Sequence, residues 1–278
     1  MSDRASAGLE APVVPRSTRF VTVDGMRIRV RIQGSGDPLL LVMGLGGNIE
    51  MWEPLVAAIP GRQTIAYDAP GTGESDLPRR PLRVRHLAAI ADQMLERLGY
   101  GAVDVLGVSL GGAVAQQLAF QAPERVRRLV LAATTPGAGG VPGNPLAMAI
   151  LLTPYRYYSR RYLRLVAPYL YGGGARRGPL MAQQALARLH RPPSLRGYFL
   201  QMLGIAGWSS LPFLRRIRQP TLVLAGDDDP IVPVVNGRIL ARLIPDARLH
   251  VVRGGGHLFL LERARDSAAV IQQFLAET

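Results

Sequence analysis

The chain has 278 residues, of which 33 are arginine, 20 are Asp or Glu and 48% are apolar. This length and apolar content fit one large domain, or one domain with an insertion, and exclude a wholly disordered chain. The absence of cysteine excludes a disulfide scaffold and a thiol nucleophile. Four scattered histidines without metal-ligand spacing lead us to expect no metal ion, and no motif implies an organic cofactor.

The net charge of +13 is concentrated in one part of the chain. Residues 141–218 hold 12 of the arginines and no Asp or Glu, while charges nearly balance elsewhere. That segment has no RNA-recognition, zinc-finger or helix-turn-helix pattern, so we expect no nucleic-acid partner. Residues 1–17 lack the apolar stretch of a signal peptide, and the central apolar run Leu146–Leu152 is too short to cross a membrane. We therefore expect a flexible N-terminal tail over 1–17 and a cytoplasmic protein.

The chain begins its predicted fold with a hairpin. Strands Arg19–Val23 and Met26–Gln33 are joined by Asp24 and Gly25, a pair typical of tight hairpin turns. The elements that follow are an apolar strand over Leu39–Met43, a helix near Ile49–Ile59, a strand over Gln63–Tyr67, a helix over Leu82–Leu98, a strand over Val103–Leu106, a helix over Leu110–Gln121 and a strand over Arg128–Ala132. This alternation predicts an α/β fold with a mostly parallel, doubly wound sheet.

The alternation stops at residue 136. It resumes with strands over Thr221–Ala225 and Arg248–Val252 and a last helix over Ala264–Ala276. We therefore predict a core over 18–135 and 219–278, with 136–218 inserted as a helical lid, or cap. Open α/β sheets bind ligands at the carboxyl ends of their strands, which is where we expect this lid to lie.

The strongest motif is Gly107-Val108-Ser109-Leu110-Gly111, which stands between a predicted strand and a predicted helix. A G-x-S-x-G sequence in that position predicts a tight turn that presents the Ser109 hydroxyl as a nucleophile. The flanking glycines are needed because side chains there would collide with the neighbouring strand or helix. The chance-match alternative is weakened by this strand-to-helix context.

A serine hydroxyl needs a base, and in this type of fold the base follows the acid in the chain. His257, after the last predicted strand and three glycines, is the candidate. The other histidines, His86 in a helix, His190 in the inserted segment and His250 within a strand, are more simply explained as surface or packing residues.

The acid that orients the histidine is expected directly after the strand Thr221–Ala225. Asp227, Asp228 and Asp229 follow it, and we choose Asp229 because Pro230 favours an extended backbone at that residue. Asp228 remains the alternative. The two unused acids would form a solvated turn.

The oxyanion of an acyl-transfer reaction needs two backbone N–H donors. We expect them from Leu110 and from Leu45, in the glycine-rich loop after the third strand. The same loop is also a partial dinucleotide-binding pattern, but Ile49 stands where that pattern needs Gly or Ala.

With these residues in place, the chain resembles the α/β-hydrolases over about residues 18–277. The turn Asp68–Ser75 is similar to the family's turn after the fourth strand, and we interpret Asp68, Gly71 and Gly73 as structural. The chain also resembles the intracellular poly(3-hydroxyalkanoate) depolymerases. The stretches that carry this second resemblance are Gly44–Gly46, Gly107–Ser109, Ala115–Gln117, Pro123–Arg125, Leu129–Thr134, Tyr171–Gly174, Pro220–Pro230 and Gly256–Leu260.

The resemblance implies a triad of Ser109, Asp229 and His257 and a polyester of 3-hydroxy acids as substrate. One position departs from it. Those depolymerases place Trp after the nucleophile, whereas this chain has Leu110, which keeps the backbone donor but is expected to change the shape of the pocket.

The predicted lid combines arginines with aromatic residues. The aromatic residues are Tyr155, Tyr157, Tyr158, Tyr162, Tyr169, Tyr171, Trp208 and Phe213. One interpretation is that they line an ester-binding cleft while Arg156, Arg160, Arg161 and Arg164 form a basic face that meets an anionic granule or lipid surface. The alternative is a solvated basic face over tyrosines that pack inside the lid.

We therefore expect a serine ester hydrolase that acts through an acyl-enzyme, similar to the intracellular poly(3-hydroxyalkanoate) depolymerases and associated with granules. The alternatives with the same triad are a small-molecule carboxylesterase or lipase, a thioesterase and a perhydrolase. The alternative from another class is a non-catalytic binding protein on this fold. No oligomeric state is predicted.

Overall fold

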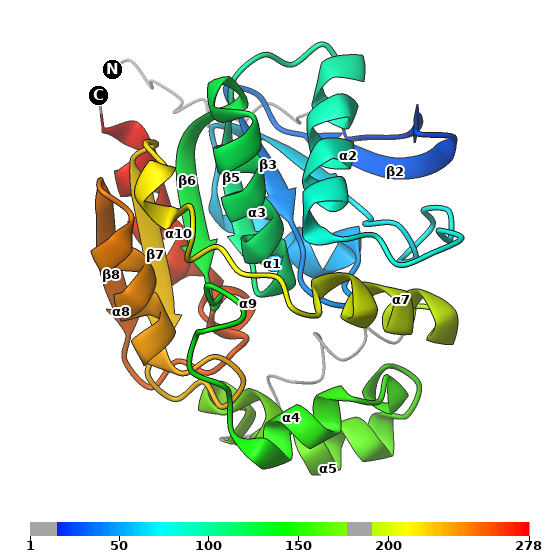
Figure 1. Cartoon of the computed structure of the whole chain (residues 1–278), viewed down its shortest axis with the longest axis vertical. Helices are drawn as coiled ribbons and strands as arrows, with labels where there is room; N and C mark the ends of the chain where they lie inside the picture. The colour runs from blue at the N-terminus through cyan, green and yellow to red at the C-terminus, as the bar shows by residue number, and fades with distance from the viewer. Residues whose placement is uncertain (1–15, 177–190, 278) are drawn as a thin grey trace, which may run out of the picture.

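An eight-stranded sheet runs through the molecule (Figure 1). The computed structural model describes residues 16–176 and 191–277. The strands are β1 (Ser17–Val23), β2 (Met26–Gln33), β3 (Asp37–Val42), β4 (Arg62–Tyr67), β5 (Val103–Val108), β6 (Val126–Ala132), β7 (Thr221–Gly226) and β8 (Ala247–Val252). Their order is β1-β2-β4-β3-β5-β6-β7-β8, with antiparallel pairing only for β1 with β2 and β2 with β4. The predicted α/β class with a mostly parallel sheet is confirmed.

The predicted hairpin is present at the start of the sheet. Val23 pairs with Met26, so Asp24 and Gly25 form a two-residue turn. Both have positive φ, 49° and 74°, as the favoured hairpin turns require. The predicted tail of 1–17 is too long by two residues at this end, because Ser17 begins β1 and Arg16 contacts Glu53 at 3.1 Å. Residues 1–15 lie outside the described residues.

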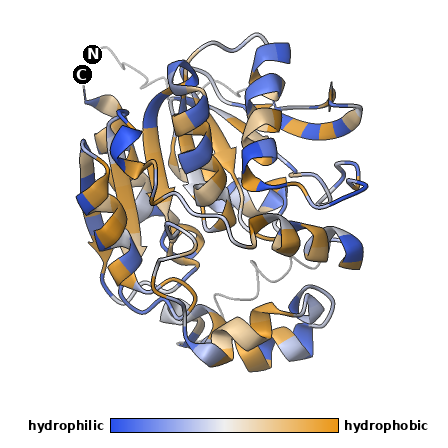
Figure 2. Cartoon of the chain, in the orientation of Figure 1, coloured by the Kyte–Doolittle hydropathy of each residue, from blue (hydrophilic) through white to orange (hydrophobic). Residues whose placement is uncertain are grey.

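Helices cover both faces of the sheet. The helices are α1 (Glu53–Ala58), α2 (Val84–Arg97), α3 (Leu110–Gln121), α4 (Pro145–Leu151), α5 (Arg160–Tyr171), α7 (Leu195–Ile205), α8 (Val234–Leu243), α9 (Phe259–Glu262) and α10 (Ala264–Ala276). Buried side chains of α2, α3 and α8 form one core on one face, and those of α1 and α10 form a second core on the other. The central strands are mostly apolar, and most hydrophilic residues lie on the surrounding helices and loops (Figure 2).

Two helices of the described chain were not predicted. The first, α8, contains Asn236 and Gly237, which are poor helix formers. Its Leu240, fully buried in the first core, shows that packing on the sheet stabilises this helix. The second, α9, is a single turn of four residues after His257.

The segment between β6 and β7 contributes α4 and α5, which lie at the carboxyl ends of the strands (Figure 1). Leu163 and Leu170 form a small core there together with Leu258, from the loop after β8. At the end of the segment, Phe213 stacks on Phe120 of α3 with ring centroids 4.3 Å apart. The segment thus contacts the core elements at several places, and its division from the core at residues 136 and 218 stays a prediction.

No helix within residues 16–176 and 191–277 combines the length and the apolar character that a membrane span would need.

Candidate active site

The Ser109 turn joins β5 to α3. Ser109 has φ 55° and ψ −120°, a conformation that L-residues rarely adopt and that costs roughly 1–3 kcal/mol. A Cβ on Gly107 would come within 2.3 Å of the Gly111 carbonyl oxygen, and one on Gly111 within 2.0 Å of the Val42 carbonyl oxygen. The motif glycines are therefore required by close backbone approach, as the sequence predicted.

His257 and Asp229 form a buried pair. His257 Nδ1 lies 2.8 Å from Asp229 Oδ2, and both residues are 6% exposed. The other oxygen, Oδ1, accepts hydrogen bonds from the N–H groups of Ile231 and Val232, each 2.9 Å long. Because a carboxylate only accepts, Nδ1 is the donor of this pair, and in a neutral imidazole the second ring nitrogen is then an acceptor.

The neighbouring acids have other partners. Asp228 Oδ2 accepts the Gly173 N–H at 2.8 Å, and its Oδ1 pairs with Arg176 at 2.9 Å. Asp227 accepts the N–H of Gly254. The geometry thus selects Asp229, and not Asp228, as the residue in contact with His257.

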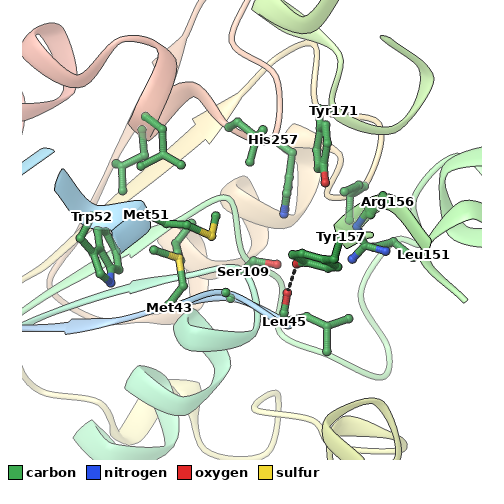
Figure 3. A pocket seen from close by; sticks show the side chains of 17 residues that line it. Met43, Leu45, Met51, Trp52, Ser109, Leu151, Arg156, Tyr157, Tyr171 and His257 are labelled. Carbon is green, nitrogen blue, oxygen red and sulfur yellow. Dashed lines mark hydrogen bonds between the residues drawn. The ribbon is translucent and has the colours of Figure 1, made fainter. Parts of the chain in front are cut away.

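Ser109 and His257 line one pocket, and the ring of His257 points toward the Ser109 hydroxyl (Figure 3). The side chains of these two described residues are not hydrogen-bonded to each other, and such bonds often tighten only when substrate is bound. His86 lies in α2 and His250 in β8, and neither lines the pocket. His190 lies outside the described residues.

The backbone N–H groups of Leu45 and Leu110 are available beside Ser109. Neither donates to an acceptor within the described parts of the chain, whereas the next N–H groups of the loop are used: Gly46 donates to Gln201 Oε1 at 2.9 Å and Gly47 to Gly44. A Cβ on Gly44 would lie 3.1 Å from the Ser109 Cβ, so this loop runs directly past the serine. With two of its donors used inside the chain, the loop does not fit the dinucleotide alternative.

Side chains from the segment between β6 and β7 hold this loop in place. The Tyr157 hydroxyl donates to the Leu45 carbonyl oxygen at 2.6 Å (Figure 3), and Gln201 of α7 accepts from Gly46. Neither role was predicted from the sequence, because each contact joins residues more than 100 positions apart and no local pattern marks them.

The same segment also supports His257. The His257 N–H donates to the Tyr171 carbonyl oxygen at 2.7 Å, at the end of α5. Gly172 and Gly173 have φ of 61° and 50°, and a Cβ on Gly173 would come within 2.2 Å of the Gly256 nitrogen. The glycine stretch after Tyr171 therefore allows α5 to end directly against the loop that carries His257.

The pocket wall is mostly apolar. It is formed by Met43, Gly44, Leu45, Gly47, Met51, Trp52, Val108, Ser109, Leu151, Arg156, Tyr157, Tyr171, Ile231, His257, Leu258, Leu260 and Leu261. Two of the predicted lid tyrosines, Tyr157 and Tyr171, line it, while Tyr155, Tyr158 and Tyr169 are exposed. The side chain of Leu110 is not among the lining residues.

Arg156 is not part of a basic surface. Its side chain is buried, with 2% of the residue exposed, and it lines the pocket. The expectation that it lies with Arg160, Arg161 and Arg164 on an exposed face is therefore wrong for Arg156, because its guanidinium is enclosed by Tyr157 and Tyr198 at 4.7 and 5.2 Å from their ring centroids. The other three arginines are exposed.

The Asp68 turn is structural, as predicted. Asp68 is fully buried, accepts the N–H groups of Ile49 and Glu74, and bonds Arg29 at 3.2 Å. Burial raises the pKa of Asp68, and the two N–H donors and Arg29 oppose that effect without overcoming it. Asp68 does not line the pocket.

No group of three or more His, Asp or Glu side chains within the described residues has the arrangement of a metal site. The site brings together the Ser109 hydroxyl, the His257–Asp229 pair and the N–H groups of Leu45 and Leu110.

Comparison with known proteins places this architecture in a family. The family model described as alpha/beta hydrolase fold matches residues 37–264. The chain belongs to the α/β-hydrolase fold family. This chain is 44% identical over 267 residues to a poly(3-hydroxyalkanoate) depolymerase of Ectopseudomonas oleovorans, with 95% of this chain and 94% of the relative covered. It is 30% identical to a 2-hydroxymuconate semialdehyde hydrolase of Pseudomonas sp. strain CF600, with 95% of each chain covered.

Solved structures agree with the α/β-hydrolase assignment. A hydrolase from Pseudomonas aeruginosa is 25% identical with a TM-score of 0.79, and 94% of this chain and 98% of that chain are covered. An enol-lactonase from Burkholderia xenovorans, 24% identical, has a TM-score of 0.80 over 93% of this chain and 100% of its own. The second likeness shows the fold alone.

Proposed function

We propose that this α/β-hydrolase is a serine ester hydrolase that cleaves polyesters of 3-hydroxy acids through an acyl-enzyme. The observation that carries the proposal is the 2.8 Å contact between His257 and Asp229 in the pocket that also holds the strained Ser109. A hydroxyl is a weak nucleophile alone, and this arrangement supplies both a base and a group that orients the base.

The first half of the reaction forms the acyl-enzyme. The free ring nitrogen of His257 removes the proton from Ser109 as Oγ attacks the ester carbonyl carbon. The carbonyl oxygen becomes an oxyanion that the N–H groups of Leu45 and Leu110 bind, each contributing roughly 3–4 kcal/mol of barrier lowering. The C–O bond then breaks, and His257 returns the proton to the departing alcohol oxygen.

The second half regenerates the enzyme. Water loses a proton to His257 and attacks the acyl carbon, the Ser109 ester bond breaks, and Oγ recovers the proton. The products are a carboxylic acid and an alcohol. When a polyester of 3-hydroxy acids is cleaved, one fragment gains a new carboxyl end and the other gains a new hydroxyl end.

Two observations support the polyester as substrate. The relative from Ectopseudomonas oleovorans named as a poly(3-hydroxyalkanoate) depolymerase matches nearly the whole chain at 44% identity. The pocket wall beside Ser109 contains Met43, Met51 and Trp52, which suit alkyl side chains.

The substrate is tested by turnover on emulsified medium-chain and short-chain polyhydroxyalkanoate, beside p-nitrophenyl esters of matched acyl length. We expect release of 3-hydroxy acids from the polymer, and loss of all activities in Ser109→Ala. Hydrolysis of the small esters without release from either polymer would leave a carboxylesterase or lipase with the same triad and would overturn the polyester substrate.

We also propose that the exposed side of α5 meets an anionic granule surface in the cytoplasm. Arg160, Arg161 and Arg164 are exposed there, and so are Leu165 and Tyr169, at 68% and 59%. Cationic residues interleaved with apolar ones suit a lipid-coated particle that carries negative charge.

A triple alanine variant at Arg160, Arg161 and Arg164 tests this surface by sedimentation with granules. We expect weaker binding than wild type at low salt and a smaller difference at high salt, because salt screens surface charge. The matched control removes three exposed arginines elsewhere, Arg79, Arg80 and Arg97. Equal losses in both variants, or in neither, would reject a specific role for α5.

A further inference from the structure

Arg156 is a buried cation in the wall of the active-site pocket. It belongs to the short 3-10 helix Tyr155–Tyr157 and is 2% exposed. Its Nη1 donates to the Thr153 carbonyl oxygen at 2.9 Å, and its Nη2 donates to the Tyr198 hydroxyl at 2.8 Å. That hydroxyl in turn donates to the Leu151 carbonyl oxygen at 2.7 Å. All these partners are neutral.

No carboxylate pairs with Arg156 in residues 16–176 and 191–277. The sequence offers none nearby either, since Asp and Glu are absent from the whole stretch 141–218. The Nε atom is buried and has no hydrogen-bond partner in the described structure. Buried charges in proteins are normally paired, because leaving water costs several kcal/mol for each ion.

The guanidinium nevertheless remains charged. Arginine side chains keep their proton inside proteins. Burial lowers the pKa of Arg156, and the hydrogen bond from its guanidinium to the Tyr198 hydroxyl acts in the opposite direction. The ring faces of Tyr157 and Tyr198 also stabilise the cation, at 4.7 and 5.2 Å. The pocket wall therefore contains a fixed positive charge that has no counterion in the described chain.

The position of this charge gives the pocket two different ends. Met43, Met51 and Trp52 lie on one side of Ser109 and His257, and Arg156, Tyr157 and Tyr171 lie on the other (Figure 3). An ester bound across Ser109 would place one of its halves against apolar side chains and the other toward the guanidinium. The half that suits Arg156 is the one that carries a negative charge.

We propose that Arg156 binds the free carboxylate of the leaving 3-hydroxy acid, so that the enzyme prefers ester bonds next to the carboxyl end of a chain. This inference rests on the proposed function and deepens it. In a polyester of 3-hydroxy acids, the terminal carboxylate is separated from the scissile carbonyl by only a few bonds. It would supply the counter-charge that the chain lacks, and planar guanidinium groups are suited to carboxylates.

The direct test uses two substrates that differ only in this charge. A trimer of 3-hydroxyoctanoic acid with a free carboxyl end is compared with the same trimer as its methyl ester. We expect kcat/KM for release of the terminal unit to be about 10- to 100-fold higher for the free acid, the worth of a hydrogen bond to a charged group. Equal values for the two trimers would overturn the inference and leave the proposed function standing.

Variants assign the preference to the residue. In Arg156→Met we expect the ratio of the two kcat/KM values, free acid over methyl ester, to fall to about onefold. Arg156→Lys should restore part of it. The matched control is Arg164→Met, which removes an exposed arginine of α5 and should keep the preference. A preference unchanged in Arg156→Met, in protein that still labels with a fluorophosphonate, would also overturn the inference.

A separate measurement covers the two cases in which the variant fails to fold or neither trimer is cleaved. The wild-type protein hydrolyses a p-nitrophenyl ester in the presence of either 3-hydroxyoctanoate or its methyl ester, and the inhibition by each compound is measured. Stronger inhibition by the carboxylate, by about tenfold or more, supports the charge site whatever the natural substrate is. Equal inhibition contradicts it. Failure on both trimers, with activity on the p-nitrophenyl ester, would count against the polyester function alone.

Discussion

Two buried arginines show how differently this chain treats charge. Arg29 of β2, 4% exposed, bonds Asp68 at 3.2 Å and Glu50 at 2.8 Å, and also lies 3.3 Å from Glu74. Arg156, 2% exposed, has carbonyl, hydroxyl and aromatic partners only. The first charge is neutralised by the chain and belongs to the architecture. The second has no counterion in the described chain, which is why we propose that a substrate carboxylate pairs with it.

The surroundings of the two arginines also differ in whether their polar groups have partners within the chain. Near Arg29, Asp68 and Glu50 bind side chains and N–H groups from several elements. In the pocket, the N–H groups of Leu45 and Leu110 have no acceptor in the described chain. A polar group satisfied inside the protein stabilises the fold, whereas one left open beside a cavity is available for a substrate.

The largest effect is expected where the acid in contact with His257 is compared with the acid before it in the sequence. Asp229→Asn should lower kcat by about 10⁴-fold, because an amide cannot hold the His257 proton on Nδ1 as a carboxylate does. Asp228→Asn should change kcat by less than about threefold, since it loses only a partly exposed ion pair with Arg176. Steady-state kinetics on a soluble ester measure both. The reverse ranking would move the acid to Asp228.

The two arginines should differ in their effect on stability. Arg29→Met leaves Asp68 and Glu50 buried without their cation, and we expect a loss of about 3–5 kcal/mol in the free energy of unfolding. Arg156→Met removes a charge with no counterion, and the loss should be at most about 1–2 kcal/mol, from the hydroxyl and carbonyl left behind. Urea denaturation of both variants gives the two values. A larger loss for Arg156→Met would reject the comparison.

A smaller effect is expected at the loop that carries Leu45. Tyr157→Phe removes the 2.6 Å hydrogen bond to the Leu45 carbonyl oxygen, so the oxyanion donor is less well fixed. We expect kcat to fall about tenfold, with the unfolding free energy within about 1 kcal/mol of wild type. Tyr155→Phe, at a residue 55% exposed, is the matched control and should be neutral. Equal kcat in the two variants would contradict the role given to Tyr157.

The smallest effect is a pH dependence around Arg29. Burial raises the pKa of Glu50. The hydrogen bond from Arg29 and the charges of Arg29 and Arg31 lower this pKa by more than burial raises it, so the net shift is downward. A lowered pKa gives stability that is present above the ordinary value of 4.5 and is lost as the pH falls below it. Asp68, whose pKa is raised, contributes with the opposite sign and reduces the slope.

Urea denaturation between about pH 3 and about pH 6 should show that the free energy of unfolding of the wild type falls as the pH is lowered. The same profile should be flatter in Glu50→Gln. Asp68→Asn should make the loss on acidification steeper, because it removes the opposing contribution. An identical acid limb in wild type and Glu50→Gln would show that the stability of the Arg29 cluster does not depend on Glu50.

Local patterns in the sequence account for much of this structure. The Asp24-Gly25 turn, the alternating strands and helices and the glycines around Ser109 act over a few residues, and each was predicted from its own chemistry. His257 and Asp229 were chosen by their place after β8 and β7, and the structure brings those two side chains into contact. Their catalytic roles remain proposals.

The features that were missed depend on contacts between distant parts of the chain. Gln201 and Tyr157 bond the Leu45 loop from more than 100 residues further along the chain, and nothing beside them in the sequence indicates those contacts. Arg156 was grouped with three exposed arginines because its neighbours in the sequence are also basic and aromatic. The useful signal was the absence of acids from 141–218, since an arginine buried there has no nearby carboxylate to pair with.

The central claim is that Ser109 carries the acyl group. Mass spectrometry of the wild-type protein after reaction with a fluorophosphonate, with Ser109→Ala alongside, tests it directly. The account predicts one adduct, on the peptide that contains Ser109, with no adduct and no ester hydrolysis in the variant. An adduct on another residue, or a Ser109→Ala protein that still hydrolyses esters at the wild-type rate, would contradict it.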